Sequence, residues 1–141
     1  MAGKILLEVV TPDKLLLLSQ QVDEVIAPGV DGEFGVLPGH CHFLTTLRIG
    51  ELRYTVSAAT HYMSVLWGFA EVTPTKVTIL AEIAEKAEDI DVDRAQAALD
   101  KAEQRLKAGG LPSEVKEAEI SLEKASLRKK IAERTRKTGH A

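Results

Sequence analysis

The amino-acid sequence predicts an α+β protein in which an N-terminal antiparallel β-sandwich, about residues 1–84, is followed by a C-terminal α-helical hairpin, about residues 88–138. The first observation behind this prediction is a series of short runs of alternating apolar and polar residues, separated by glycine and proline. The second is that glycine and proline disappear between Ala81 and Gly109, where alanine, glutamate and lysine take over. Short strands joined by glycine turns are typical of a small sandwich or barrel, and the change in composition marks a domain boundary.

The expected strands show the two-residue period of half-buried β-structure. Phe43, Thr45 and Leu47 fall on one face of a strand, together with Ile49, and the residues between them fall on the other face. The predicted strands are Ile5–Val10, Leu15–Leu18, Val22–Ala27, Gly35–Leu37, Phe43–Ile49, Leu52–Ser57, His61–Leu66, Phe69–Val72 and Lys76–Ala81.

The stretch from Ala27 to Gly50 contains five of the ten glycines and two of the five prolines. Glycine adopts positive φ at little steric cost, and proline fixes φ and removes a hydrogen-bond donor. We therefore expect the backbone to turn repeatedly within this stretch, between short strands.

The first helix is predicted from an apolar stripe at spacings of three and four residues. Asp91 is the expected N-cap, and Gly109-Gly110 followed by Pro112 is a strong stop signal. The stripe consists of Val92, Ala95, Leu99, Ala102 and Leu106.

Ser113 is expected to cap a second helix, and the short link between the helices predicts an antiparallel hairpin. Its seam is predicted at Val115, Ala118, Leu122 and Ala125, with Ile120, Leu127 and Ile131 on a neighbouring stripe. Alanine in place of leucine at a seam position forgoes roughly 2 kcal/mol of hydrophobic stabilisation. The hairpin is therefore expected to be weakly held and able to move.

Composition limits the classes of function. The longest aliphatic run, Leu15–Leu18, is far too short to span a bilayer, so any membrane association is expected to go through a partner. The single cysteine, Cys41, agrees with a reducing cytoplasm. The net charge of −3 is uneven, because residues 82–103 carry −5 and residues 123–141 carry +5.

The cluster His40-Cys41-His42 contains residue types that bind zinc, but a zinc site usually needs three or four protein ligands. The other histidines show no paired spacing, so a simple turn is the favoured interpretation and no metal is expected. The sequence also contains no nucleophile elbow, Walker loop or Rossmann fingerprint. An enzyme in its own right is not expected.

Four runs of residues together resemble one known family. Gly32–His40 (GEFGVLPGH) and Phe43–Leu47 (FLTTL) are similar to the signature of the epsilon subunit of the F-type ATP synthase. Gly68–Val72 and Val77–Glu82 resemble the last sandwich strands of the same family. Family members usually carry Ala and Pro at positions 41 and 42, where this sequence has cysteine and histidine.

The resemblance implies a non-catalytic subunit in the central stalk of a bacterial proton-driven ATP synthase. It would bind the gamma subunit and the ring of membrane-embedded c subunits, and couple rotation of the c-ring to ATP synthesis. Its helices would restrain ATP hydrolysis at the alpha/beta catalytic head. The expected location is the cytoplasmic face of the bacterial plasma membrane, as a peripheral protein held there by the complex.

The resemblance also implies sites. Glu33 and His40, in the turns of the opening signature, are the expected contacts with the c-ring. On the second helix, a basic face is expected to meet an acidic loop of the catalytic subunit, and its residues are Arg128, Lys129, Lys130 and Arg134. A nucleic-acid partner is disfavoured because residues 82–141 contain no aromatic side chain to stack on bases.

The start of the first helix is similar to the motif by which some bacterial epsilon subunits bind ATP. The residues concerned are Ile90, Asp91, Arg94 and Ala95. Arg94 is expected to pair with a phosphate and Asp91 to accept a hydrogen bond from the adenine amino group. Lys101 stands where ATP-binding relatives tend to have a second arginine, and lysine cannot form the planar two-point contact. The alternative, which stays open, is an acidic helix start that binds no ligand. No cofactor is expected to be required, and a regulatory ATP is the one small-molecule ligand considered.

Two other classes of function stay open at this point. One is a stand-alone binding module whose sandwich carries a basic regulatory helical tail. The other is a metal-dependent enzyme built on the His40-Cys41-His42 turn.

Overall fold

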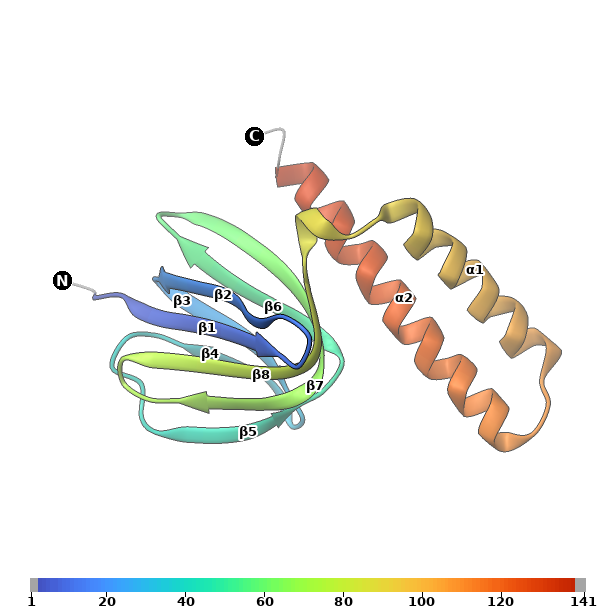
Figure 1. The fold of residues 1–141 in the computed structure, drawn as a ribbon, viewed down its shortest axis with the longest axis horizontal. Helices are drawn as coiled ribbons and strands as arrows, with labels where there is room; N and C mark the ends of the chain where they lie inside the picture. The colour runs from blue at the N-terminus through green and yellow to red at the C-terminus, as the bar shows by residue number, and fades with distance from the viewer. Residues whose placement is uncertain (1–2, 139–141) are drawn as a thin grey trace. The chain divides into compact units, whose positions relative to one another are not determined.

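The computed structural model describes residues 3–138 and divides the chain into one compact unit that ends at Lys86 and a second that starts at Ala87 (Figure 1). Residues 1 and 2, at the start of the predicted sandwich, lie outside the described residues. The strands are β1 (Ile5–Thr11), β2 (Leu15–Val22), β3 (Glu24–Gly29), β4 (Gly32–Val36), β5 (Phe43–Leu47), β6 (Gly50–Val56), β7 (Ala59–Val72) and β8 (Lys76–Lys86). The helices are η1 (Ala87–Asp89), α1 (Val92–Ala108) and α2 (Pro112–Thr138).

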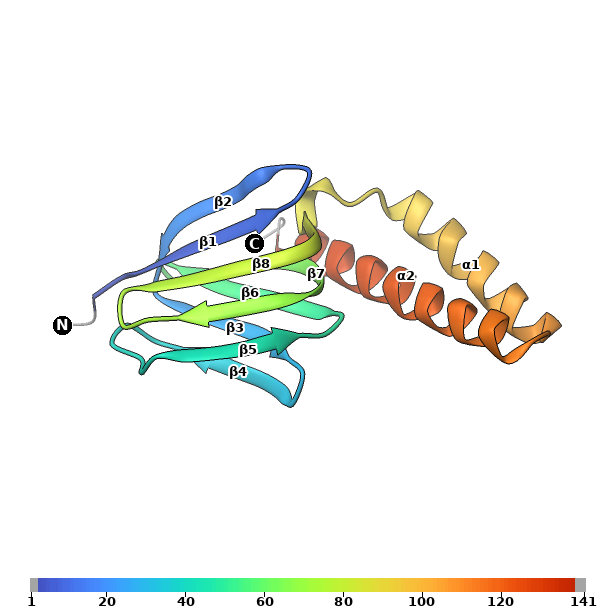
Figure 2. The same cartoon turned by 60° about the horizontal axis from the view of Figure 1, so that its bottom comes forward.

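The strands form a β-sandwich whose two layers share the long strands β7 and β8 (Figure 2). One layer runs in the order β2-β1-β8-β7-β5. In the other, β4, β3 and β6 follow one another, and β6 pairs with the first half of β7. The predicted fold class, a sandwich followed by a helical pair, is therefore confirmed.

One strand pairing departs from the predicted antiparallel arrangement. β1 and β8 run parallel, with Leu6 beside Lys76 and Val10 beside Leu80, so the sheet is mixed. A parallel pair needs a long connection instead of a tight turn. The chain between these two strands contains six other strands, which provide that connection.

The prediction of two separate strands at His61–Leu66 and Phe69–Val72 is wrong, because both belong to β7. Trp67 and Gly68 have positive φ angles of 52° and 136°, which bend the strand without ending it. A Cβ atom added to Gly68 would lie 1.9 Å from the carbonyl oxygen of Leu80 on β8. Glycine is thus required for the close approach of the two strands at the bend.

Several predicted strand ends also need correction. β8 continues to Lys86 instead of ending at Ala81, β2 continues to Val22 instead of ending at Leu18, and β4 spans Gly32–Val36 instead of Gly35–Leu37. In each case partner strands complete the hydrogen bonding of residues whose own β-propensity is low, such as Ser19 on β2 and the glycines of β4. Tertiary pairing therefore overrides local preference at these ends.

The sandwich core is built from the inward-facing residues of both layers. β1 shows the expected alternation, with Ile5, Leu7 and Val9 fully buried and the residues between them half-buried. Cross-strand neighbours on the inner face include Val25, which pairs with both Val36 and Tyr54. The inner face is apolar throughout this cluster, so the first unit has its own hydrophobic core.

The helical unit is an αα-hairpin with an alanine-rich seam. The Asp91 carboxylate caps α1 by accepting a hydrogen bond from the Arg94 backbone N–H at 3.1 Å, and Gly109 ends the helix at φ 70°, as expected. The prediction that Ser113 caps α2 is wrong: the helix starts at Pro112, and the Leu111 carbonyl accepts the first helical hydrogen bond from Val115. Proline is well suited to a first helical position, because its missing N–H would have no partner there. The buried seam alanines are Ala95, Ala102, Ala118 and Ala125.

Candidate interaction surfaces

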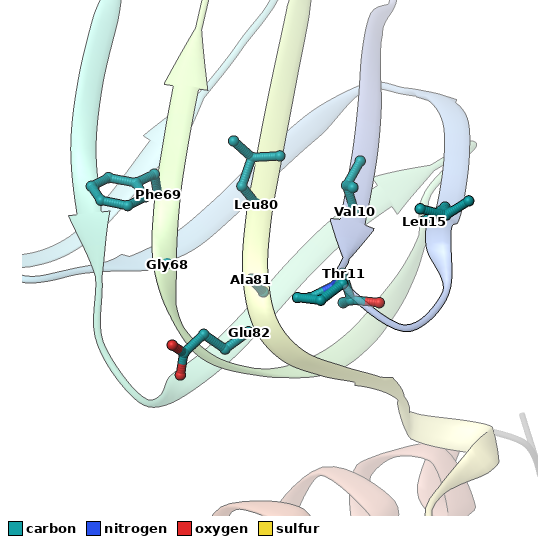
Figure 3. A pocket seen from close by; sticks show the side chains of 9 residues that line it. Val10, Thr11, Leu15, Gly68, Phe69, Leu80, Ala81 and Glu82 are labelled. Atoms are coloured by element: carbon teal, nitrogen blue, oxygen red, sulfur yellow. The ribbon is translucent and has the colours of Figure 1, made fainter.

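A row of apolar side chains crosses the outer face of the β2-β1-β8-β7-β5 layer, and Figure 3 shows Phe69, Leu80 and Val10 among them. The pairing register places Leu16, Val10, Leu80 and Phe69 side by side on four successive strands. Leu16 is 51% exposed, Leu80 48% and Phe69 52%. Because residues in register on neighbouring strands share a face, the four side chains form one continuous surface, which we call the apolar row.

A groove of about 480 Å³ lies along this surface. Gly68 and Ala81 leave space at its floor, and the Phe69, Leu80 and Val10 side chains stand around it in Figure 3. Leu15, 74% exposed, and Glu82 complete its edge. The groove can accept apolar side chains of a partner.

Carboxylates border the apolar row along both central strands. Glu71 lies two residues beyond Phe69 on β7, and Glu82 lies two residues beyond Leu80 on β8. Within residues 3–138 neither of these exposed side chains forms an ion pair, whereas Glu8 on the same face is paired with Lys76 at 2.5 Å. The rim therefore carries net negative charge and favours a partner with cations around an apolar centre.

The apolar row was not identified from the sequence. The sequence did contain a signal for it. Val10, Phe69 and Leu80 are apolar, but each occupies a position that the alternation along its strand turns outward, where a polar residue is expected. The strands that carry them are far apart in the sequence, so only the pairing register brings them together.

The predicted ring-contact residues lie on β4 and in the turn that follows it. Glu33 is on the outer face of β4, and its Oε1 atom lies 3.3 Å from Nη2 of Arg53. In His40, the backbone N–H donates to the Leu37 carbonyl at 3.1 Å, and Nδ1 lies 2.7 Å from the Cys41 carbonyl oxygen. Both residues are on the first unit, but no direct contact joins them among the described interactions.

The turn that contains His40 is tied to a second turn. The Gly39 N–H donates to the carbonyl of Pro74 at 2.8 Å, and Gly39 has the positive φ of 85° that favours glycine. Cys41 is exposed, with Sγ 3.8 Å from His40 Nδ1. Among the described residues no group of three or more His, Cys, Asp or Glu side chains is placed to hold a metal ion.

The predicted ATP-site residues lie close in sequence but differ in exposure. Ile90 and Ala95 are buried, at 7% and 0% exposure. Asp91 and Arg94 are exposed, and one carboxylate oxygen of Asp91 already caps the helix. Only Asp91 and Arg94 of the four residues therefore present polar side-chain groups to a ligand.

The predicted basic face lies in the C-terminal half of α2. Lys130 is exposed, and Arg128, Lys129 and Arg134 are half-buried. Lys130 and Arg134 are four residues apart and lie on one side of the helix, whereas Ile131 and Ala132 are buried. The four cations thus do not form a uniformly exposed face.

One carboxyl group of the sandwich has a perturbed pKa. The Lys4 ammonium, which donates to Asp23, and the Ser57 backbone N–H, which donates to the same carboxylate at 2.9 Å, lower the pKa of Asp23 below its ordinary value of 3.8. Asp23 lies between β2 and β3, so this contact ties the start of the chain to the β6–β7 turn.

Two family models match successive parts of the chain. Residues 4–87 match "ATP synthase, Delta/Epsilon chain, beta-sandwich domain", and residues 88–133 match "ATP synthase, Delta/Epsilon chain, long alpha-helix domain". These ranges meet within one residue of the division between the two units of the structure.

Individual relatives agree with the family models. The ATP synthase epsilon chain of Nitratidesulfovibrio vulgaris (strain DP4) is 54% identical over 125 residues, covering 89% of this chain and 92% of the relative. The epsilon chain of Syntrophobacter fumaroxidans is 50% identical over 135 residues, covering 96% and 100%. In a structure of the Euglena gracilis mitochondrial ATP synthase (OSCP/F1/c-ring), one chain aligns with a TM-score of 0.77 and 25% identity, covering 89% of this chain and 79% of that one. The sandwich, the helical pair, both family models and these identities show that the chain belongs to the ATP synthase epsilon chain family.

Proposed function

We propose that this chain is the epsilon subunit of the central stalk of a bacterial ATP synthase, and that the apolar row docks it onto the gamma subunit. The observation that supports this proposal is the apolar row itself, in which Leu80, Phe69 and Leu16 are about half exposed on a folded sandwich. Contiguous exposed apolar surface of this kind marks a protein interface. The similar Euglena gracilis chain comes from an OSCP/F1/c-ring assembly, which agrees with a stalk position.

The role that follows is mechanical. A sandwich fixed to the gamma subunit by one surface and to the ring of c subunits by another turns with both, and it transmits the rotation that drives ATP synthesis. Glu33 and the His40 turn are the proposed ring contact, because their polar groups lie at the surface of the sandwich. The subunit itself has no catalytic step in this scheme.

The helical unit is the proposed regulatory part. Its seam is formed largely by alanine, so opening the hairpin exposes little apolar area and costs little free energy. We propose that an opened α2 restrains ATP hydrolysis by bringing Arg128, Lys129, Lys130 and Arg134 to an acidic loop of the catalytic head.

The proposed location is the cytoplasmic face of the bacterial plasma membrane, where the proton-driven synthase would hold the subunit as a peripheral protein. Among the described residues, no helix is both long and apolar enough to cross a bilayer.

Reconstitution tests the proposed function. Purified chain is added to membrane-bound ATPase that has been depleted of its epsilon subunit, and proton pumping and ATP hydrolysis are measured together. Restored coupling of hydrolysis to pumping is the expected result. Failure of the chain to bind the depleted complex at micromolar concentration would contradict the proposal and favour a stand-alone binding module.

A further inference from the structure

Arg53 lies between two carboxylates on the outer face of the sandwich. Its Nη1 atom is 3.2 Å from Oε1 of Glu51, and its Nη2 atom is 3.3 Å from Oε1 of Glu33. Glu51 and Arg53 are alternate residues of β6 and so share a face, whereas Glu33 comes from β4 on the far side of β3. One guanidinium group thus links side chains from two strands that do not pair with each other.

The three side chains differ in exposure. The side chain of Glu33 is 46% exposed, that of Arg53 27% and that of Glu51 6%. The Nη1 atom of Arg53 is therefore held by the nearly buried carboxylate of Glu51. Its Nη2 atom is presented to the exposed carboxylate of Glu33. A planar guanidinium group suits such a role, because its two terminal nitrogens point in fixed directions.

We propose that Arg53 is a positioning residue, which holds the Glu33 carboxylate in the orientation used for binding the c-ring; this inference rests on the ring contact proposed above for Glu33. A free glutamate at the surface samples several rotamers, and binding must select one of them. Arg53 contacts Oε1 of Glu33, and within residues 3–138 no contact is found for Oε2, which is left to accept a hydrogen bond or a cation from the ring. Lysine at position 53 has a single nitrogen and cannot link both carboxylates in the same way.

A double-mutant cycle tests this proposal. The probe is the detergent-solubilised rotor of the same synthase, the c-ring with its gamma subunit, immobilised on a sensor, and the analyte is the full chain. Variants are Glu33→Ala, Arg53→Ala and the double variant, with Arg53→Gln as a second version in case the alanine variant does not fold. Arg48→Ala, which removes an exposed arginine of the same unit, is the matched control.

Arg53→Ala is expected to raise the Kd by about two- to tenfold, the usual cost of ordering one flexible side chain on binding. The double variant is expected to bind as Glu33→Ala does, because Arg53 acts through Glu33. Arg53→Lys, added as the conservative variant, is expected to recover only part of the affinity that Arg53→Ala loses. Arg48→Ala is expected to leave the Kd unchanged.

The two proposals can fail separately. If Glu33→Ala weakens binding but Arg53→Ala and Arg53→Gln leave the Kd unchanged, the positioning role is refuted and the ring contact stands. Equal effects of Arg53→Ala in the presence and absence of Glu33 would also refute it, because Arg53 would then act independently of Glu33. If Glu33→Ala itself has no effect, the proposed ring contact is refuted together with this inference.

Discussion

Replacement of Leu80 by aspartate introduces a charge at the centre of the apolar row and leaves the inner face of β8 unchanged. Leu80 is 48% exposed and lies between Val10 and Phe69 in the pairing register. Complete burial of a leucine is worth about 1.5–3 kcal/mol, so covering the exposed half is worth about 1 kcal/mol. An unpaired carboxylate buried at an interface adds a penalty of several kcal/mol. A combined loss of about 3 kcal/mol or more corresponds to at least about a hundredfold rise in the Kd for gamma.

The assay is a calorimetric titration of the purified gamma subunit into each variant. Val30→Asp is the control, because Val30 is 56% exposed in the turn between β3 and β4 and lies outside the row. Circular dichroism and the thermal midpoint establish whether both variants keep the fold. Both are expected to do so, because about half of each replaced side chain is exposed to solvent. Equal gamma affinity of Leu80→Asp and wild type would refute docking through the apolar row.

Three further predictions concern the other sites. Asp91→Ala and Arg94→Ala are expected to weaken ATP binding, measured by calorimetry, without loss of helix. If the wild-type protein does not bind ATP at millimolar concentration, the predicted ATP site is refuted and these residues only form a capped helix start. Alanine at all four positions of the basic face is expected to raise the rate of ATP hydrolysis by the reconstituted complex. Added salt is expected to have the same effect on the wild-type complex, because it screens these charges. Unchanged rates in both experiments would mean that these cations do not restrain hydrolysis. The interactions that lower the pKa of Asp23 also stabilise the folded state. This stabilisation is present above the unfolded-state pKa, near 3.8, and is lost as the pH falls through the lower folded-state pKa. The urea midpoints of wild type and Asp23→Asn should therefore differ at pH 7, begin to converge near pH 4 and coincide only below the lowered pKa of Asp23. A constant difference across this range would contradict the assigned ion pair.

The helical unit could be predicted closely because its signals are local. Asp91 caps α1 through a contact three residues away, and Gly109 ends the helix with its own φ angle. The seam follows from the helical period alone, which determines which residues share a face. The error at Ser113 has the same local character, because Pro112 competes for the first turn of α2 and takes the first helical position.

The strand period also determined which residues of the sandwich point inward, as β1 shows. The tertiary structure decided which strands became neighbours: β1 lies parallel to β8, and β7 continues through a bend that needs Gly68. The same pairings created the apolar row, and they set Arg53 between Glu33 and Glu51. The physical reason is that alternation along a strand specifies a side chain's face, whereas its neighbours on that face depend on long-range hydrogen bonding between segments far apart in the chain.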